Sequence, residues 1–174
     1  DMAGIEKIIQ LVGSIGRLDV LINNASSFYP TPLEQCTNEQ WDDLINSNLK
    51  GPFFLTQGLA PQLIAARGSV VNISDMHARQ ALADHPIYTI AKAGNIAMTK
   101  SMALDMAPHV RVNSVAPGAI LWPEHEEDDI SKQNSVLNNV PMGRLGNEMD
   151  IAGTAFFLAV DASYVTGQTI AVDG

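Results

Sequence analysis

Tyr88 and Lys92 stand four residues apart in the stretch YTIAK, a spacing that can place a phenol beside a cation. Residues i and i+4 of a helix lie on the same face, so the Lys92 ammonium can approach the Tyr88 hydroxyl. A neighbouring positive charge favours the phenolate, and we therefore expect the pKa of Tyr88 to fall toward neutral pH. A tyrosine tuned in this way can act as a general acid. The alternative is an ordinary amphipathic pair in which Lys92 is solvated.

Ser74 and Asp75 close a short apolar stretch that precedes Tyr88. Because strand side chains alternate between two faces, only one of these neighbours can meet Tyr88. A serine there would donate a neutral hydrogen bond to a carbonyl oxygen, whereas a carboxylate accepts from N–H groups or, when protonated, supplies a proton. The carboxylate therefore suits a ring C=N bond, whose nitrogen must be protonated during reduction. The alternative is that Asp75 only caps the following turn, and that Ser74 or another hydroxyl acts.

Asn48 and Pro52 form a second pair with a structural consequence. Pro52 lacks the N–H that would bond the Asn48 carbonyl in a helix, so we expect a kink there and a carbonyl that needs another donor. The alternative is a kink that serves packing alone. Farther upstream, the segment SSFYP at 26–30 presents two adjacent aromatic residues, Phe28 and Tyr29.

A flat bicyclic ring would stack well on such aromatic residues, with a gain of about 0.5 to 1.5 kcal/mol beyond burial. The segment follows an Asn-Asn-Ala turn at the end of an expected strand, which is where ligands bind in an open parallel sheet. Phe28 is thus a candidate substrate platform. The alternative is that Phe28 and Tyr29 only pack the loop onto the core.

Alternating helix and strand patterns position these residues. Apolar residues recur at helical spacing or in short continuous runs, and Thr37 is an expected helix N-cap. The expected helices are 3–16, 38–66, 85–107 and 150–159, and the expected strands are 18–22, 69–74, 110–115 and 169–172. Nearly continuous apolar strands between helices predict a parallel sheet that is covered on both faces. Residues 117–147 form the one long irregular stretch, an expected substrate-loop region.

Composition limits the classes of function. A chain of 174 residues with 46% hydrophobic content predicts one α/β domain spanning 1–174. The net charge of −9 argues against nucleic acid or an anionic membrane as a partner. No stretch reaches the roughly 18 apolar residues of a spanning helix, and the single cysteine, Cys36, excludes an internal disulfide, so we expect a cytoplasmic protein. The four histidines show no paired metal spacing, and we expect no metal site.

Four motifs together resemble the short-chain dehydrogenase/reductase family, and within it the pteridine reductases. They are NNAS at 23–26, YTIAK at 88–92, RVNSVAPGAI at 111–120 and YVTGQTIAVDG at 164–174. The resemblance implies a Rossmann-type doubly wound parallel sheet and NADPH as cofactor. The cofactor-binding residues that it implies are Asn24, Ala25, Ser26, Tyr88, Lys92, Pro117 and Gly118.

The same resemblance assigns roles at the site. The family spacing selects Asp75, at a position where most members carry serine, and pteridine reductases carry Asp, Tyr and Lys at these three positions. In the family the asparagine that matches Asn48 holds, by its carbonyl, a water that contacts the lysine. The implied catalytic residues are Asp75, Tyr88, Lys92 and Asn48, and the implied substrate-binding residues are Ser26, Phe28, Asp75, Tyr88 and Trp122. A polar substrate contact is in doubt at Ile120, where protozoan relatives carry serine.

The family opens with a glycine-rich TGxxxGxG loop between a strand and a helix, and no such motif occurs in these 174 residues. We therefore expect the N-terminal glycine-rich βαβ portion to be absent from this chain, which would leave the strand at 18–22 with an exposed apolar edge. The predicted function is an NADPH-dependent pteridine reductase that acts on dihydropterin or dihydrofolate rings, as a homotetramer. The alternatives are a carbonyl or 3-ketoacyl reductase of the same family and a non-catalytic fragment or scaffold subunit.

Overall fold

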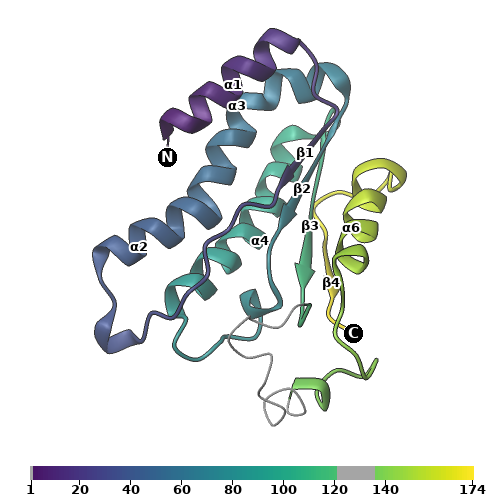
Figure 1. The fold of residues 1–174 in the computed structure, drawn as a ribbon. Coiled ribbons are helices and arrows are strands. Elements are labelled where there is room, and N and C mark those ends of the chain that lie inside the picture. Colours follow the sequence, from purple (N-terminus) through teal and green to yellow (C-terminus); the bar gives the residue numbers. More distant parts are fainter. Residues whose placement is uncertain (1, 121–135) are drawn as a thin grey trace.

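The computed structural model describes residues 2–120 and 136–174 (Figure 1). Helices and strands alternate along the chain, as the sequence patterns predict. The helices are α1 (Met2–Ile15), α2 (Asn38–Ile45), α3 (Gly51–Ala66), α4 (Pro86–Met106) and α6 (Glu148–Phe156). The strands are β1 (Val20–Asn23), β2 (Ser69–Ile73), β3 (Arg111–Pro117) and β4 (Thr169–Val172).

The strands form a 4-stranded parallel sheet in the order β1-β2-β3-β4. Neighbouring strands are in register near their carboxyl ends, where Asn23 lies opposite Asn72 and Asn72 lies opposite Ser114. Parallel strands bring their carboxyl ends to one edge of the sheet, so the segments that follow β1, β2 and β3 meet there. That edge is the ligand-binding side of open α/β sheets.

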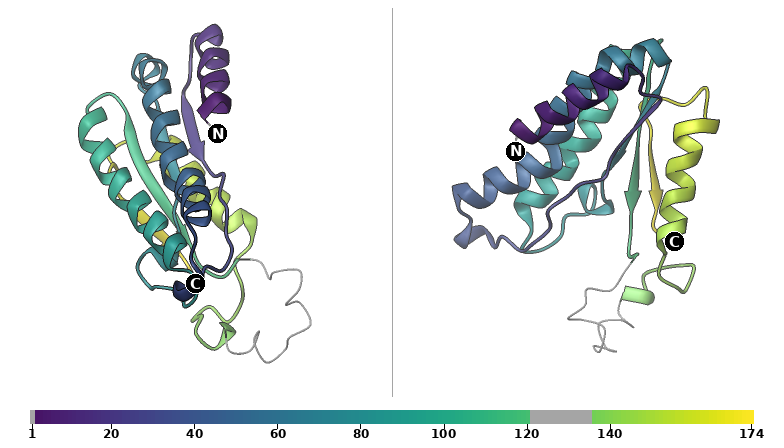
Figure 2. Two further views of the ribbon diagram at one scale, coloured as in Figure 1. Left: turned by 90° about the vertical axis from the view of Figure 1, so that its left-hand side faces the viewer. Right: turned by 45° about the horizontal axis from the view of Figure 1, so that its top comes forward.

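Helices cover both faces of the sheet, which confirms the predicted doubly wound architecture (Figures 1 and 2). Helices α1, α3 and α4 lie on one face, and α6 lies on the other. The chain moves across the sheet in the same direction from β2 to β3 and from β3 to β4, yet α4 and α6 lie on opposite faces. The connection through α6 therefore has the opposite hand to the connection through α4, so one of them departs from the general right-handed rule.

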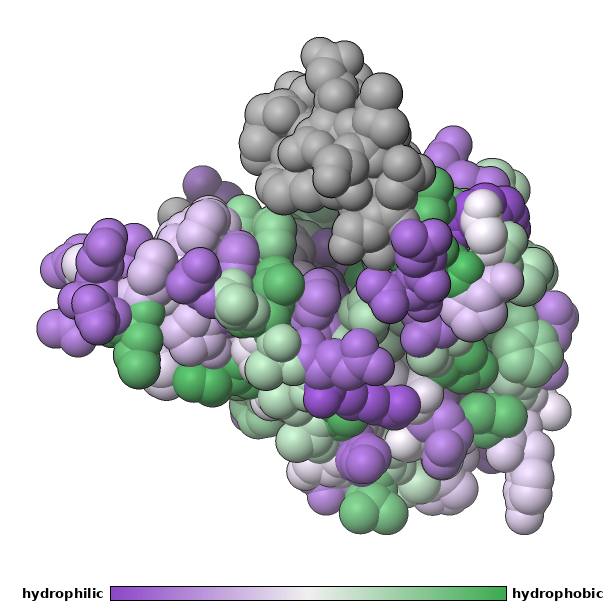
Figure 3. All heavy atoms as spheres, turned by 90° about the horizontal axis from the view of Figure 1, so that it is seen from below, coloured by the Kyte–Doolittle hydropathy of each residue, from purple (hydrophilic) through white to green (hydrophobic). Residues whose placement is uncertain are grey.

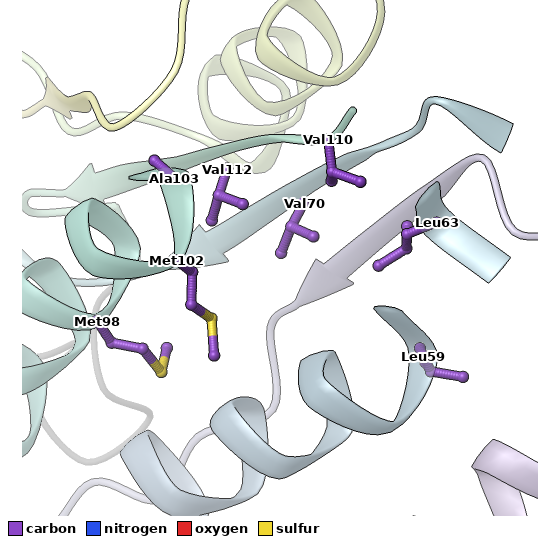
Figure 4. Close-up of a cluster of buried hydrophobic side chains, with 8 residues drawn as sticks. All are labelled: Leu59, Leu63, Val70, Met98, Met102, Ala103, Val110 and Val112. Atoms are coloured by element: carbon purple, nitrogen blue, oxygen red, sulfur yellow. The ribbon is translucent and has the colours of Figure 1, made fainter. Parts of the chain in front are cut away.

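Alternate residues of the central strands feed two separate cores. Val70 and Val112 point to the α3 and α4 side, where they pack with Leu59, Leu63, Met98, Met102, Ala103 and Val110 (Figure 4). Val71 and Val115 point to the α6 side and pack with Ala155, Leu158, Ala159 and Ala162. Both faces of β2 and β3 are therefore buried, and their apolar residues are interspersed with the buried polar residues Ser69, Asn72, Asn113 and Ser114.

The long helix expected over 38–66 is interrupted at the place where a kink was predicted. Thr37 forms a capping box with Gln40 at the start of α2, and a π-helical turn, η2 (Asn46–Lys50), joins α2 to α3. Pro52 occupies the first turn of α3, where a missing N–H costs little. The finding corrects the form of the prediction, since the helix widens into a single π turn instead of simply bending.

A ladder of buried polar side chains crosses the α3 and α4 side near the carboxyl ends. Asn23 Nδ2 donates to Thr56 Oγ1 at 3.1 Å and to Asn72 Oδ1 at 2.8 Å. Asn72 Nδ2 donates in turn to Thr99 Oγ1 at 2.9 Å, and Thr99 donates to the Asn95 carbonyl at 2.9 Å. A satisfied buried network of this kind rigidifies its surroundings. It ties β1, β2, α3 and α4 together directly beneath the candidate site.

Candidate active site

Tyr88 and Asp75 meet at the carboxyl edge of the sheet. Tyr88 lies in the first turns of α4, and Asp75 follows the end of β2 by two residues. The Tyr88 hydroxyl donates to Asp75 Oδ2 at 2.7 Å. The ring of Tyr88 is buried with 4% of its surface exposed, so the phenol is held in one orientation.

The two oxygens of Asp75 have different partners. Oδ1 accepts from the backbone N–H of His77 at 2.8 Å and caps the short 3-10 helix η3 (Met76–Ala78), while Oδ2 accepts from Tyr88. Ser74 points away, since its hydroxyl donates to the Val115 carbonyl at 3.1 Å. The side chain that meets Tyr88 is thus that of Asp75, and Asp75 also caps the following turn. The capping contact of the alternative is present, but Asp75 does not only cap the turn, and Ser74 does not face Tyr88.

Lys92 lies one turn after Tyr88 and is almost fully buried. Its Nζ donates to the Ile73 carbonyl at the end of β2 at 3.0 Å and lies 5.5 Å from the centre of the Tyr88 ring. An ammonium has three N–H donors, so Lys92 keeps donor capacity beyond the bond to Ile73. The solvated alternative for Lys92 is therefore wrong.

The electrostatics of the Tyr88 phenol differ from the prediction. Burial raises the pKa of Tyr88 above its usual value of 10.0, the charge of Asp75 and the hydrogen bond to Asp75 raise it further, and a smaller contribution from Ser26 lowers it. The expected fall toward neutral pH is therefore wrong, because burial, and after it the negative charge of Asp75, disfavour the phenolate. Burial also lowers the pKa of Lys92 to about 8, against the opposing charge of Asp75.

Asn48 lies in the π turn η2 and is 1% exposed. Its side chain secures the loop after β1, since Oδ1 accepts from the Ser26 hydroxyl at 2.6 Å and Nδ2 donates to the Ser27 carbonyl at 2.9 Å. Its main-chain carbonyl accepts from Asn95 Nδ2 at 3.2 Å. The predicted need for another donor is thus confirmed, and the donor is a side chain of α4.

Phe28 lies beside Tyr88 with 55% of its surface exposed. The two rings meet edge to face with their centres 4.8 Å apart, and the imidazole of His85 stacks on Phe28 at 4.8 Å with an interplanar angle of 10°. The backbone N–H of Thr31 donates to the Asp84 carbonyl at 2.6 Å, which ties the two loops together. Phe28 therefore forms part of an aromatic wall at the site and is not buried in the core.

The residues expected to hold the cofactor follow the carboxyl ends of β1 and β3. Asn24, Ala25 and Ser26 follow β1, and Gly118 follows Pro117 at the end of β3. A Cβ on Gly118 would lie 2.7 Å from the Asp173 Cα atom, so packing against the end of β4 already requires glycine there. These segments and the remaining N–H donors of Lys92 lie at the carboxyl edge of the sheet, so this edge fits the nicotinamide end of a dinucleotide.

Two further observations bound the site. Trp122 lies outside the described residues, so its expected substrate contact stays a prediction. A cavity that touches Asn24 and Ala25 opens toward α1 and α3 and does not include Tyr88, so it lies beside the site. Figure 3 views the carboxyl edge, where polar and apolar residues are intermixed on the visible surface.

Within 2–120 and 136–174, no group of three or more His, Cys, Asp or Glu side chains is arranged to hold a metal ion. In the same ranges, no helix combines the length and the apolar character that crossing a bilayer requires.

Sequence reasoning missed two residues of the site. His85 was considered only as a possible metal ligand, and its stacking on Phe28 depends on the path of two loops. Asn95 carries no motif, and its contact with Asn48 joins residues that are 47 positions apart. Its position three residues after Lys92, on the same face of α4, was the one available signal.

The sequence of this chain is similar to those of known oxidoreductases. A family model described as enoyl-(acyl carrier protein) reductase matches residues 2–174. The 3-oxoacyl-(acyl-carrier-protein) reductase FabG of Thermotoga maritima is 41% identical over 173 residues, which cover 98% of this chain and 69% of that protein. The chain belongs to the short-chain dehydrogenase/reductase family.

Solved structures of the family superpose closely on this chain. A putative short-chain alcohol dehydrogenase from Sinorhizobium meliloti 1021 matches with a TM-score of 0.93 and 31% identity, over 100% of this chain and 71% of that one. A putative 2-deoxy-d-gluconate 3-dehydrogenase from Agrobacterium tumefaciens with bound NADP matches with a TM-score of 0.83 and 36% identity, over 90% and 66%. These relatives support an NAD(P)-dependent oxidoreductase, and the similarity to FabG favours the ketoacyl alternative over the pteridine reductase prediction.

Proposed function

We propose that this short-chain dehydrogenase/reductase reduces a C=N bond of a dihydropterin or dihydrofolate ring, with NADPH as cofactor. The observation that carries the proposal is the Asp75 carboxylate, whose Oδ2 lies 2.7 Å from the Tyr88 hydroxyl. A carbonyl oxygen placed beside this pair would face a carboxylate that offers it no donor. A pterin ring presents N–H groups, for which the carboxylate is a matching acceptor.

Each side chain then has a distinct task. Tyr88 holds the proton that passes to the ring nitrogen, and Asp75 orients the ring by accepting from its N–H groups. The exposed face of Phe28 gives the flat ring a stacking surface, and Ser26 lies between Asn48 and Tyr88 at the inner end of the site. When bound, the cofactor supplies the hydride that the ring carbon receives. Asn24, Ala25, Ser26, Lys92, Pro117 and Gly118 are the residues that would hold it.

The raised pKa of Tyr88 is consistent with this assignment. At neutral pH the phenol keeps its proton, since burial and the negative charge of Asp75 both disfavour the phenolate. Substrate N–H groups that bond to Asp75 would neutralise part of that effect and release Tyr88 to donate toward the ring. In this proposal residues 1–174 act as one reductase domain, 117–147 serve the substrate, and subunits assemble as a homotetramer.

A 3-ketoacyl reductase is the second candidate, and the named FabG relative favours it. In that case the substrate carbonyl would accept from Tyr88 directly. Asp75 would then have to be protonated or turned aside for a carbonyl oxygen to approach. Asp75 is therefore the residue that separates the two candidates.

The test measures NADPH oxidation with dihydrobiopterin and, separately, with a 3-ketoacyl substrate. Wild type is compared with Asp75→Ser and with Asp75→Asn, which keeps a side-chain oxygen for the His77 cap but removes the charge. We expect wild type to prefer the pterin and both variants to lose at least about 100-fold in kcat/KM on it, the lower end of what a positioned acid or base contributes. A preference for the ketone, unchanged or improved by Asp75→Ser, would leave only the ketoacyl candidate.

A further inference from the structure

Asn95 is a buried polar residue of α4 to which no motif assigns a role. It is 1% exposed, and its Nδ2 donates to the Asn48 carbonyl at 3.2 Å. Its own Oδ1 is buried with no hydrogen-bond partner within the part of the chain that the structure describes. Buried amide oxygens are nearly always paired in native proteins, so an unpaired one calls for an explanation.

The orientation of the Asn95 amide follows from its partner. The Asn48 carbonyl can only accept, so the NH₂ group of Asn95 must face it and Oδ1 must point the other way. Helical side chains lean toward the N-terminus, over the residues three and four positions earlier. Oδ1 is thus carried on the same face of α4 as Lys92, whose ammonium has donors beyond the one used by Ile73.

The contact between η2 and α4 is close enough to hold this arrangement. A Cβ on Gly94 would lie 2.8 Å from Leu49 Cδ2, so the absence of a side chain at 94 lets the π turn approach the helix. Asn95 follows Gly94 directly and bonds to the neighbour of Leu49. The backbone of Asn48 is therefore fixed to the same helix that carries Tyr88 and Lys92.

We propose that Asn95 is a positioning residue for proton supply to Tyr88, which holds the Asn48 carbonyl and presents its own Oδ1 to a water that bonds to the Lys92 ammonium. A buried water needs two or more polar partners, and Oδ1 and the Lys92 N–H groups provide them. The inference rests on the proposed role of Tyr88 as proton donor. It does not depend on whether the substrate is a pterin or a ketone.

The proposal gives different roles to the side chain of Asn48 and to its main-chain carbonyl. Asn48→Ala removes the bonds to Ser26 and Ser27 but leaves the main-chain carbonyl and its bond from Asn95 in place. Asn95→Ala removes the donor to the carbonyl and the free Oδ1 but leaves the Ser26 loop secured. We therefore expect different defects from the two variants.

The experiment compares both variants with wild type, using whichever substrate wild type reduces. We expect Asn95→Ala to lower kcat by about 10- to 100-fold, the scale for a slightly misplaced catalytic group, and to shift the pH profile of kcat. The KM for NADPH of Asn95→Ala should stay within about twofold of the wild-type value, because the substitution removes no contact that binds the cofactor. Asn48→Ala should instead raise the KM for NADPH, since the loop after β1 loses its anchor.

Asn113→Ala is the matched control, because Asn113 is equally buried and makes two backbone contacts, with Val165 and Gln168, at a distance from Tyr88. It should lower Tm and leave kcat unchanged. If Asn95→Ala behaves like this control, Asn95 is structural and the proposal is wrong. If Asn95→Ala does not accumulate as folded protein, Asn95→Ser is measured in its place.

A readout without substrate keeps this test separate from the proposed function. The pKa of Lys92 can be followed by NMR titration of the lysine side chain, in wild type and in Asn95→Ala. Loss of a water that accepts from the ammonium should lower that pKa further. An unchanged pKa would overturn the proposal, even if the protein turned over neither the pterin nor the ketone.

Discussion

The two faces of the sheet are built from the same strands and differ in kind. On the α3 and α4 side, polar side chains are buried in a hydrogen-bonded series that runs from Asn23 to Asn95 and ends beneath Tyr88. On the α6 side, Val71 and Val115 meet Leu158 in an apolar core. Both faces bury an apolar core, but the polar series that leads to the predicted catalytic residues lies on the α3 and α4 side.

Loss of the Tyr88 hydroxyl should give the largest effect of any change on the polar face. Tyr88→Phe keeps the ring and its contact with Phe28 but removes the proton, so we expect kcat to fall by about 10²- to 10⁴-fold with Tm little changed. Steady-state turnover and thermal unfolding measure the two quantities. Tyr164→Phe, at a fully exposed residue, is the control for loss of a hydroxyl. Substantial residual activity in Tyr88→Phe would mean that another group donates the proton.

A substitution that creates a cavity on the α6 side should lower stability and leave turnover unchanged. Leu158 is fully buried, and Leu158→Ala is expected to lower the free energy of unfolding by about 2 to 5 kcal/mol. Turnover per folded molecule should stay within about twofold of wild type, because no polar contact of the site is altered. Urea unfolding and active-site titration provide these values. A large fall in kcat would show that the two faces are coupled, which would weaken the comparison.

The pH dependence of stability tests the polar face alone. Burial lowers the pKa of Lys92 from 10.5 to about 8, so between these values the unfolded chain keeps a proton that the folded chain releases. Stability must rise with pH across this window, because the cost of burying the ammonium is removed. The gain should be on the order of 2 kcal/mol by pH 10, above which ionisation of Tyr88 in the unfolded chain opposes it.

Lys92→Met provides the comparison, since it keeps the apolar stem and has no charge to lose. Urea unfolding of both proteins across the window should give a rising curve for wild type and a flatter one for the variant. Parallel curves would mean that Lys92 is more solvated than its burial indicates.

The smallest effect should come from the aromatic wall at the edge of the polar face. Removing the imidazole that stacks on Phe28 costs about 0.5 to 1.5 kcal/mol of ring packing, so His85→Ala should raise the KM for the substrate by roughly two- to tenfold. His85→Phe retains a stacking partner and should restore most of the loss. Steady-state kinetics of both variants measure the KM for the substrate. A KM of His85→Ala equal to that of wild type would show that Phe28 binds the substrate without the stacked imidazole.

The sequence patterns predicted the fold well because each element is periodic over its own length. Every expected helix and strand lies within a few residues of its place in the structure, and the alternation of Val70 and Val71 between two cores follows from strand geometry. The interruption by Pro52 was also local, and so the kink was predicted, although its π-helical form was not.

The site was harder to predict where its contacts join distant segments. The spacing of Asp75 and Tyr88 was informative, yet the pKa of Tyr88 is raised by burial and then by the charge of Asp75, and no spacing shows how deeply the phenol is buried. Asn95 and His85 were missed because their partners, Asn48 and Phe28, lie far away along the chain. The split use of the Asp75 oxygens likewise appears only in three dimensions.

Because the connection through α6 has the opposite hand, the two faces of the sheet are covered by helices from different stretches of the chain. The predicted catalytic side chains, Asn48, Asp75, Tyr88 and Lys92, all precede the end of α4, whereas the helix that covers the other face begins at Glu148. If both connections had the same hand, α4 and α6 would lie on the same face of the sheet, and early and late segments of the chain would share that face. Here a break in the backbone between β3 and α6 would leave every predicted catalytic group on one piece and the α6 cover on the other, a natural partition for reassembling the enzyme from two chains.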